Sequence, residues 1–114
     1  MTIKPVICVG SSRDELRAFP AEARERAGLE LYLVQRGVEP RDWKPMPSVG
    51  AGVREIRVRV GRAFRVLYVT KFADAVYVLH AFEKKTQKTP TRDIELARQR
   101  LAELLRIRSE EKRP

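Results

Sequence analysis

The sequence predicts a small α+β domain in which a mainly antiparallel sheet is covered by helices on one face. Three strand-like stretches follow one another in the second half of the chain, and short connections make them antiparallel neighbours. Helical repeats of apolar residues precede and follow them. With 114 residues the chain is large enough for one core. We therefore expect a single domain over residues 1–114, in the order β-α-α-β-β-β-α.

The N-terminal part predicts one strand and two helices. Residues 3–9, IKPVICV, read as a short strand. Ser12 and Glu15 have the spacing of a capping box, which starts a first helix over roughly residues 13–18. A second helix runs from Pro20 toward Gly37. Its buried face is expected to consist of Ala23, Ala27, Leu31 and Val34.

Residues 38–52 contain three prolines and two glycines and are predicted to be a connecting loop. Trp43 is expected to anchor this loop to the core, with stacking on a nucleic-acid base as the alternative. The strands follow at residues 53–60, 62–72 and 75–82.

The last helix is expected to start at Thr89-Pro90, as an N-cap followed by a first helical residue. Its buried stripe is Ile94, Ala97, Leu101 and Leu104. The tail from about residue 109 is expected to fray.

Charge is the strongest global property of the sequence. There are 24 Lys and Arg against 15 Asp and Glu, a net charge of +9, which favours an anionic partner such as nucleic acid. The lone Cys8 forms no internal disulfide and suits a reducing compartment. No apolar run is long enough to cross a membrane and no signal peptide is evident, so we expect a cytoplasmic protein.

The positive charge is concentrated in the strands and after the last one. The set comprises Arg54, Arg57, Arg59, Arg62, Arg65, Lys71, Lys84, Lys85 and Lys88, with Glu55 as the acid among residues 53–71. In an antiparallel meander, Arg57, Arg59 and Arg65 can lie together on the face away from the helices. We interpret this cluster of arginines as a phosphate-binding surface. The alternative, that the side chains merely extend into water, is less favoured.

These residue types suit metal-free RNA cleavage. Phosphate-loop motifs and Cys or His metal clusters are absent from the sequence, and no cofactor or metal is expected. The 2′-OH of RNA can attack the adjacent phosphate if the protein aligns the nucleotide, stabilises charge and moves protons. His80 is a possible general base, although a core histidine bonded to backbone is the favoured interpretation. Phe82 either stacks on a base or lies at the rim of the core.

Several segments resemble the RelE/HigB/ParE superfamily of toxins. They are VREIRV, FRVLYV and above all LHAFEKKTQKTP before the final helix, and the similarity is greatest to the HigB-like, phage-derived branch of type II toxin–antitoxin systems. The resemblance implies a ribosome-dependent mRNA endoribonuclease, a cognate antitoxin that often has a helix-turn-helix domain, and ribosome and mRNA as partners.

The resemblance also implies roles for individual residues. Arg57, Arg65, Lys84 and Lys85 take the catalytic positions, while Arg54, Arg59 and Lys88 are expected to bind RNA. The C-terminal catalytic tyrosine of RelE-type toxins is absent, because no tyrosine follows Tyr77. The roles of general acid and general base are therefore left to be assigned among Lys84, Lys85 and His80.

Two alternatives share the fold. ParE-type members inhibit DNA gyrase without cleaving RNA, and a non-enzymatic RNA-binding module would use the same surface. The dense Arg and Lys surface and the KKTQKTP segment favour the ribonuclease.

Overall fold

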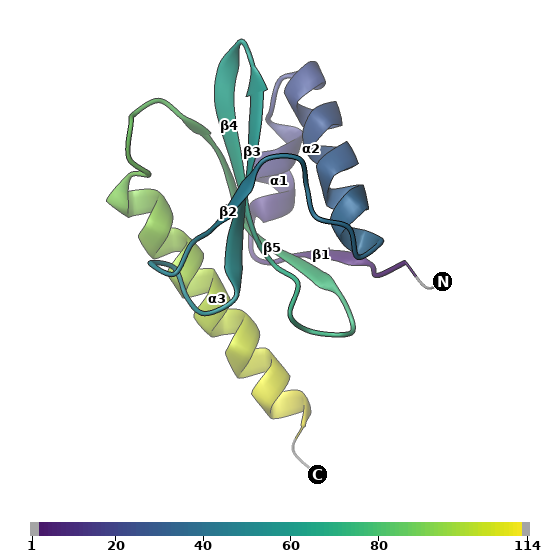
Figure 1. Cartoon of the computed structure of the whole chain (residues 1–114). Helices are drawn as coiled ribbons and strands as arrows, with labels where there is room; N and C mark the ends of the chain where they lie inside the picture. Colours follow the sequence, from purple (N-terminus) through teal and green to yellow (C-terminus); the bar gives the residue numbers. More distant parts are fainter. Residues whose placement is uncertain (1–2, 113–114) are drawn as a thin grey trace.

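A five-stranded mixed sheet in the order β1-β5-β4-β3-β2 forms the centre of the molecule (Figure 1). The computed structural model describes residues 3–112. The strands are β1 (Val6–Cys8), β2 (Trp43–Pro45), β3 (Val53–Val60), β4 (Arg62–Val69) and β5 (Val76–Lys84). The helices are α1 (Ser12–Arg17), α2 (Ala21–Gln35) and α3 (Thr91–Glu111). The predicted α+β class is confirmed. No helix among the described residues is long and apolar enough to cross a membrane.

The predicted antiparallel meander is formed by β3, β4 and β5. Gly61 makes the turn between β3 and β4 with a φ of 71°, a conformation that glycine adopts without steric cost. The turn sets the register in which Arg57 lies opposite Arg65. β1 adds to the other edge of β5 in parallel, with Val6 opposite Val76.

Helices α1 and α2 pack on one face of the sheet, as predicted. The α2 residues Ala23, Ala27, Leu31 and Val34 are all buried there. They contact strand residues of one parity, among them Ile56, Val58 and Val66.

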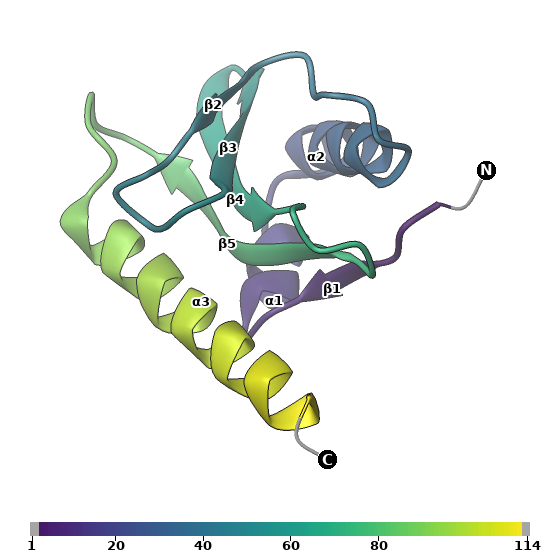
Figure 2. The ribbon, with the colours of Figure 1, turned by 60° about the horizontal axis from the view of Figure 1, so that its bottom comes forward.

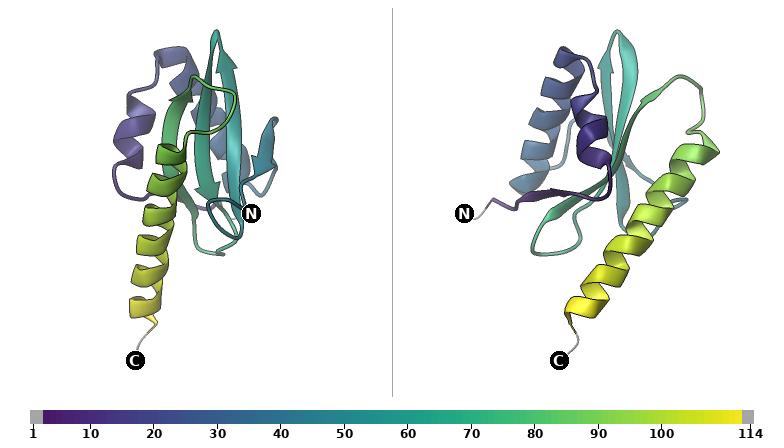
Figure 3. Two further views of the ribbon diagram at one scale, coloured as in Figure 1. Left: turned by 90° about the vertical axis from the view of Figure 1, so that its left-hand side faces the viewer. Right: turned by 180° about the vertical axis from the view of Figure 1, so that it is seen from behind.

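Helix α3 differs from the prediction because it covers part of the opposite face (Figures 2 and 3). Its residues Ala97, Leu101 and Leu104 pack in one cluster with Val53, Leu67, Val69 and Leu79. The reason lies in β5, which is apolar on both parities and therefore needs cover on both faces. The open part of this face is consequently confined to the region near the β3–β4 turn, which α3 does not reach (Figure 1).

The loop expected at residues 38–52 contains a short strand. In β2, Trp43 lies opposite Ile56 and Pro45 opposite Arg54. Proline at the end of an outer strand is tolerated because no further strand needs its missing N–H. Trp43 is half-buried, and the guanidinium of Arg54 lies over its ring.

Both predicted N-caps are wrong. Ser12 is the first residue of α1, and its hydroxyl donates to the carbonyl of Val78 at 3.0 Å instead of capping the helix. At α3 the N-cap is Pro90 and no side chain caps the helix. Thr89 Oγ1 instead donates to Glu55 at 3.4 Å. At its other end α3 continues to Glu111, past the residue where fraying was expected.

Candidate functional site

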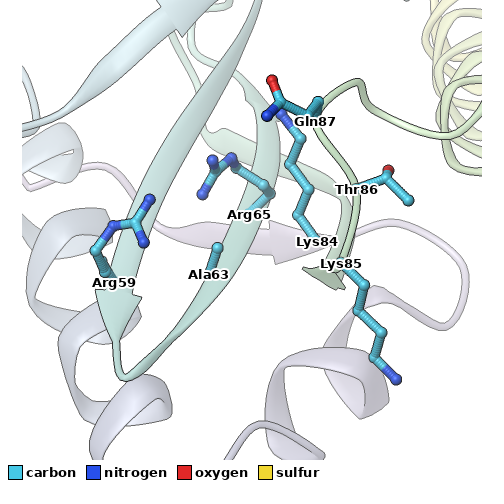
Figure 4. Close-up of a pocket in the computed structure, with 7 residues that line it drawn as sticks. All are labelled: Arg59, Ala63, Arg65, Lys84, Lys85, Thr86 and Gln87. Atoms are coloured by element: carbon cyan, nitrogen blue, oxygen red, sulfur yellow. The ribbon is translucent and has the colours of Figure 1, made fainter.

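A basic hollow of about 430 Å³ lies between the end of the β3–β4 hairpin and the segment that follows β5 (Figure 4). Its lining residues are Arg59, Ala63, Arg65, Lys84, Lys85, Thr86 and Gln87. This is the part of the sheet that α3 leaves open. The hollow therefore presents cationic side chains to solvent at a place where an extended anionic ligand has access.

Arg65 forms the back of this hollow. It is only 8% exposed, and its cross-strand neighbours are Arg57 on β3 and Phe82 on β5. One terminal nitrogen donates to the carbonyl of Phe64 at 3.0 Å. Its Nε lies 3.4 Å from Glu55 Oε1 but forms no hydrogen bond. Burial lowers the pKa of Arg65, and the charge of Glu55 opposes this effect. The guanidinium is thus fixed by packing while keeping donors available to a ligand.

Glu55 is the buried centre of the charge cluster. Its side chain has no exposed surface, and its Oε1 lies within ion-pair distance of three cations. The distances are 3.4 Å to Arg57 Nε, 3.4 Å to Arg65 Nε and 4.0 Å to Lys44 Nζ. A single carboxylate does not neutralise three cations, so this end of the sheet keeps an excess of positive charge. Arg57 also lies 3.9 Å from the exposed Asp42.

Lys84 ends β5 beside Arg65, and Figure 4 shows the two side chains next to each other. Burial lowers the pKa of Lys84, and the positive charge of Arg65 lowers it further. At a given pH a larger fraction of Lys84 is therefore the neutral amine than in an ordinary lysine, and the neutral amine is the form that a general base requires. Lys85 points away from Arg65 in the same view, as expected for consecutive residues in an extended chain.

The structure brings most of the predicted site residues together. Arg59, Arg65, Lys84 and Lys85 line the hollow, and Arg57 lies beside it through the shared contact with Glu55. Lys88 is exposed in the following loop but does not line the hollow.

Arg54 does not join the basic hollow. It lies on the α2 face of β3, because residues an odd number apart in a strand point to opposite faces. This geometry therefore does not support the prediction that Arg54 binds RNA on the same surface as Arg59 and Lys88.

His80 is a core residue, but its partners are carboxylates and not backbone. Its Nδ1 lies 2.8 Å from Glu15 and its Nε2 2.6 Å from Asp93, while Arg100 also binds Glu15 at 2.7 Å. Burial acts to lower the pKa of His80, but the two carboxylates outweigh it and raise the pKa above 6.5. His80 stacks on Phe82, which is buried as well, and neither lines the hollow. Through Glu15 and Asp93, His80 thus joins β5 to α1 and α3.

Sequence reasoning missed the importance of Glu55. The signal was present, because Glu55 shares its parity with Arg57 and Arg59 and is the acid within a basic strand. Thr86 and Gln87 were also missed. They line the hollow from an irregular segment, for which the sequence offers no periodic pattern.

The fold and the hollow together define a small basic α+β domain that offers arginine and lysine to an anionic ligand. A family model described as "Phage derived protein Gp49-like (DUF891)" matches residues 14–102. The chain therefore belongs to this family of toxin-like proteins of the RelE/HigB type. No curated protein matches the sequence.

Proposed function

We propose that this protein is the toxin of a type II toxin–antitoxin system and acts as a ribosome-dependent, metal-independent mRNA endoribonuclease. The observation that carries the proposal is the pairing of Arg65, a rigidly held guanidinium, with Lys84, an amine whose pKa is lowered, in one open hollow. Family membership supports a toxin, and the excess of positive charge supports an RNA substrate.

In the proposed reaction the 2′-OH of one nucleotide attacks its own 3′ phosphate. Neutral Lys84 accepts the 2′-OH proton while Arg65 binds the phosphate oxygens, on which charge builds in the transition state. The new 2′-O–P bond replaces the bond to the 5′ oxygen, giving a 2′,3′-cyclic phosphate and a 5′-hydroxyl end. The leaving oxygen takes its proton from solvent, because Lys85 points away from Arg65.

The hollow provides charge for a phosphate but few groups that read base edges. We therefore assign positioning of the message to the ribosome, with Arg57, Arg59 and Lys88 attracting the RNA backbone. The same charge suits a cognate antitoxin whose acidic or amphipathic segment covers the hollow. We expect this antitoxin to carry a helix-turn-helix domain, as the resemblance to HigB-like toxins implies.

The test is primer extension on mRNA from a translating extract, with and without the purified protein. Discrete cuts that require translation are the expected result. Cuts of naked mRNA at the same sites and rate would contradict ribosome dependence. Inhibition of DNA supercoiling without cuts would instead establish the gyrase-inhibitor alternative. Expression alone should arrest growth, and co-expression of the neighbouring gene's product should restore it.

A further inference from the structure

Arg54 is held on the face of the sheet opposite the basic hollow. Its guanidinium carbon lies 4.2 Å from the centre of the Trp43 ring, a cation–π contact that holds the guanidinium over the ring. Among the described residues it forms no ion pair, and it is half-buried. A guanidinium has five N–H donors and no acceptor. Arg54 therefore presents oriented donors that still need acceptors.

Tyr68 is the cross-strand partner of Arg54 and points to the same face. The side chain is completely buried, and its hydroxyl has no hydrogen-bond partner within residues 3–112. Burial raises the pKa of Tyr68, so the hydroxyl keeps its proton, although the approach of an Arg54 N–H to the hydroxyl oxygen, and then the charge of Arg54, act against this rise. Arg54 is thus close to the hydroxyl without reaching hydrogen-bond geometry. Because arginine cannot accept, the hydroxyl proton lacks an acceptor whichever way it turns.

The two side chains meet at a hollow of about 230 Å³ under the end of α2. Val38, Glu39, Pro40 and Thr70 line it together with Arg54 and Tyr68. A second cation stands at its edge, since Lys4 Nζ donates to Thr70 Oγ1 at 3.2 Å and to the Thr70 carbonyl at 2.9 Å. A water molecule takes about 30 Å³ in the liquid, so the hollow has room for a carboxylate or phosphate group.

We propose that Arg54 and Tyr68 form an oxyanion-binding site that is separate from the basic hollow. Both groups donate, both lack an acceptor, and they converge on one small space; an oxyanion supplies acceptors to each. Trp43 holds the guanidinium in place in the absence of ligand. Glu39 stands at the rim as an exposed carboxylate, and its charge weakens the binding of any anion.

Residue-resolved NMR tests this site directly. The ¹⁵N-labelled full-length protein is titrated with inorganic phosphate and, separately, with acetate, at constant ionic strength set by chloride. The amides of Gly37 and Thr70 report on the proposed site, whereas those of Ala63 and Gln87 report on the basic hollow. We expect saturable shifts at Gly37 and Thr70. A response to phosphate identifies a tetrahedral anion as the ligand, and a response to acetate alone identifies a carboxylate.

Variants distinguish this site from general attraction of anions. Tyr68→Phe removes the hydroxyl and keeps the ring, and should weaken binding at Gly37 and Thr70 by about tenfold, the loss of one hydrogen bond to a charged group. Tyr32→Phe, which removes the hydroxyl of an exposed tyrosine, is the matched control and should bind as the wild type does. Glu39→Gln should tighten binding. Equal binding by Tyr68→Phe, or no saturable shift with either anion, would overturn the proposal. Ribonuclease activity is not involved in these readouts, so the site and the proposed function can fail independently.

Discussion

Arg57 and Arg65 are direct cross-strand partners in the antiparallel ladder between β3 and β4. Like charges in this arrangement repel each other. Glu55 Oε1 lies 3.4 Å from the Nε of each, so one buried carboxylate holds both guanidinium groups in place. The arrangement still leaves positive charge in excess, which a bound phosphate would neutralise.

Replacing Glu55 by glutamine should therefore destabilise the protein. We expect a loss of roughly 1.5–3 kcal/mol in the free energy of unfolding, the range for hydrogen bonds to charged groups. Urea unfolding measures the loss. Inorganic phosphate should restore more stability to Glu55→Gln than to the wild type, because it replaces the missing negative charge. Glu95→Gln, at an exposed position of α3, is the control. Equal stability of the two variants would refute the role given to Glu55.

Arg65→Ala should slow cleavage by about a hundredfold or more, which corresponds to about 2.7–4 kcal/mol for one transition-state donor. Binding to ribosomes should remain almost unchanged. Single-turnover cleavage on programmed ribosomes at saturating protein separates the two quantities. Arg26→Ala, which removes the same charge from an exposed position of α2, should cleave at the wild-type rate. Arg65→Lys should not rescue the rate, since an ammonium cannot bind two phosphate oxygens in parallel.

Arg59→Ala and Lys88→Ala should act on binding instead. Both side chains are exposed, and each is assigned to an RNA phosphate. We expect each variant to bind ribosomes more weakly. In a plot of the logarithm of the binding constant against the logarithm of the salt concentration, the slope should fall by about one. Titrations at several salt concentrations give that slope. If Arg59→Ala instead loses cleavage at saturation while Arg65→Ala keeps it, the two roles have been exchanged.

Lys84 should titrate at a lower pH than an ordinary lysine. Burial is the main cause and the charge of Arg65 adds to it. NMR titration of the Lys84 side-chain ¹³Cε resonance measures its pKa directly. In Arg65→Met the pKa should rise, because a neighbouring positive charge is removed. A Lys84 that titrates at or above 10.5 in the wild type contradicts its assignment as general base.

The Glu15–His80 pair should limit stability at both ends of the pH range. Burial acts to raise the pKa of Glu15, but hydrogen bonds from His80 and Arg100 lower it to about 2. The carboxylate thus stabilises the fold above pH 4.5, and this contribution is lost as the pH falls toward 2. The contribution of Glu15 to the free energy of unfolding is at most about 3 kcal/mol.

His80 acts in the opposite direction, because its folded pKa lies above 6.5. Its contribution is complete below pH 6.5 and is lost as the pH rises through the folded value. Urea unfolding between pH 2 and 9 should show both losses. Glu15→Gln should remove the acid limb, whereas Asp14→Asn, at an exposed neighbouring position, should retain it. An unaltered acid limb in Glu15→Gln would show that other carboxylates cause it.

The meander was predictable because its turns are short and its strands alternate. Which face of the sheet α3 covers was not predictable. β5 is apolar on both faces, and an amphipathic helix has the same sequence pattern whichever of them it packs against. For the site, the even spacing of Arg57 and Arg59 predicted that they share one face of the strand. Arg54 lies an odd number of residues from both, so the sequence also indicated that it points to the other face. By contrast, Glu15, His80, Asp93 and Arg100 come from three separate elements, so only tertiary structure unites them.

Because side chains alternate along β3, its two faces respond differently to substitutions and to insertions or deletions. Arg54 and Arg57 belong to opposite faces of the same eight-residue strand. A substitution alters one face and leaves the other intact. A single-residue insertion or deletion between Arg54 and Arg57 shifts the parity of one relative to the other, and places Arg57 against the helical core or Arg54 among the cations. Divergence along this strand is therefore expected to proceed by exchange of residues, with its length held constant.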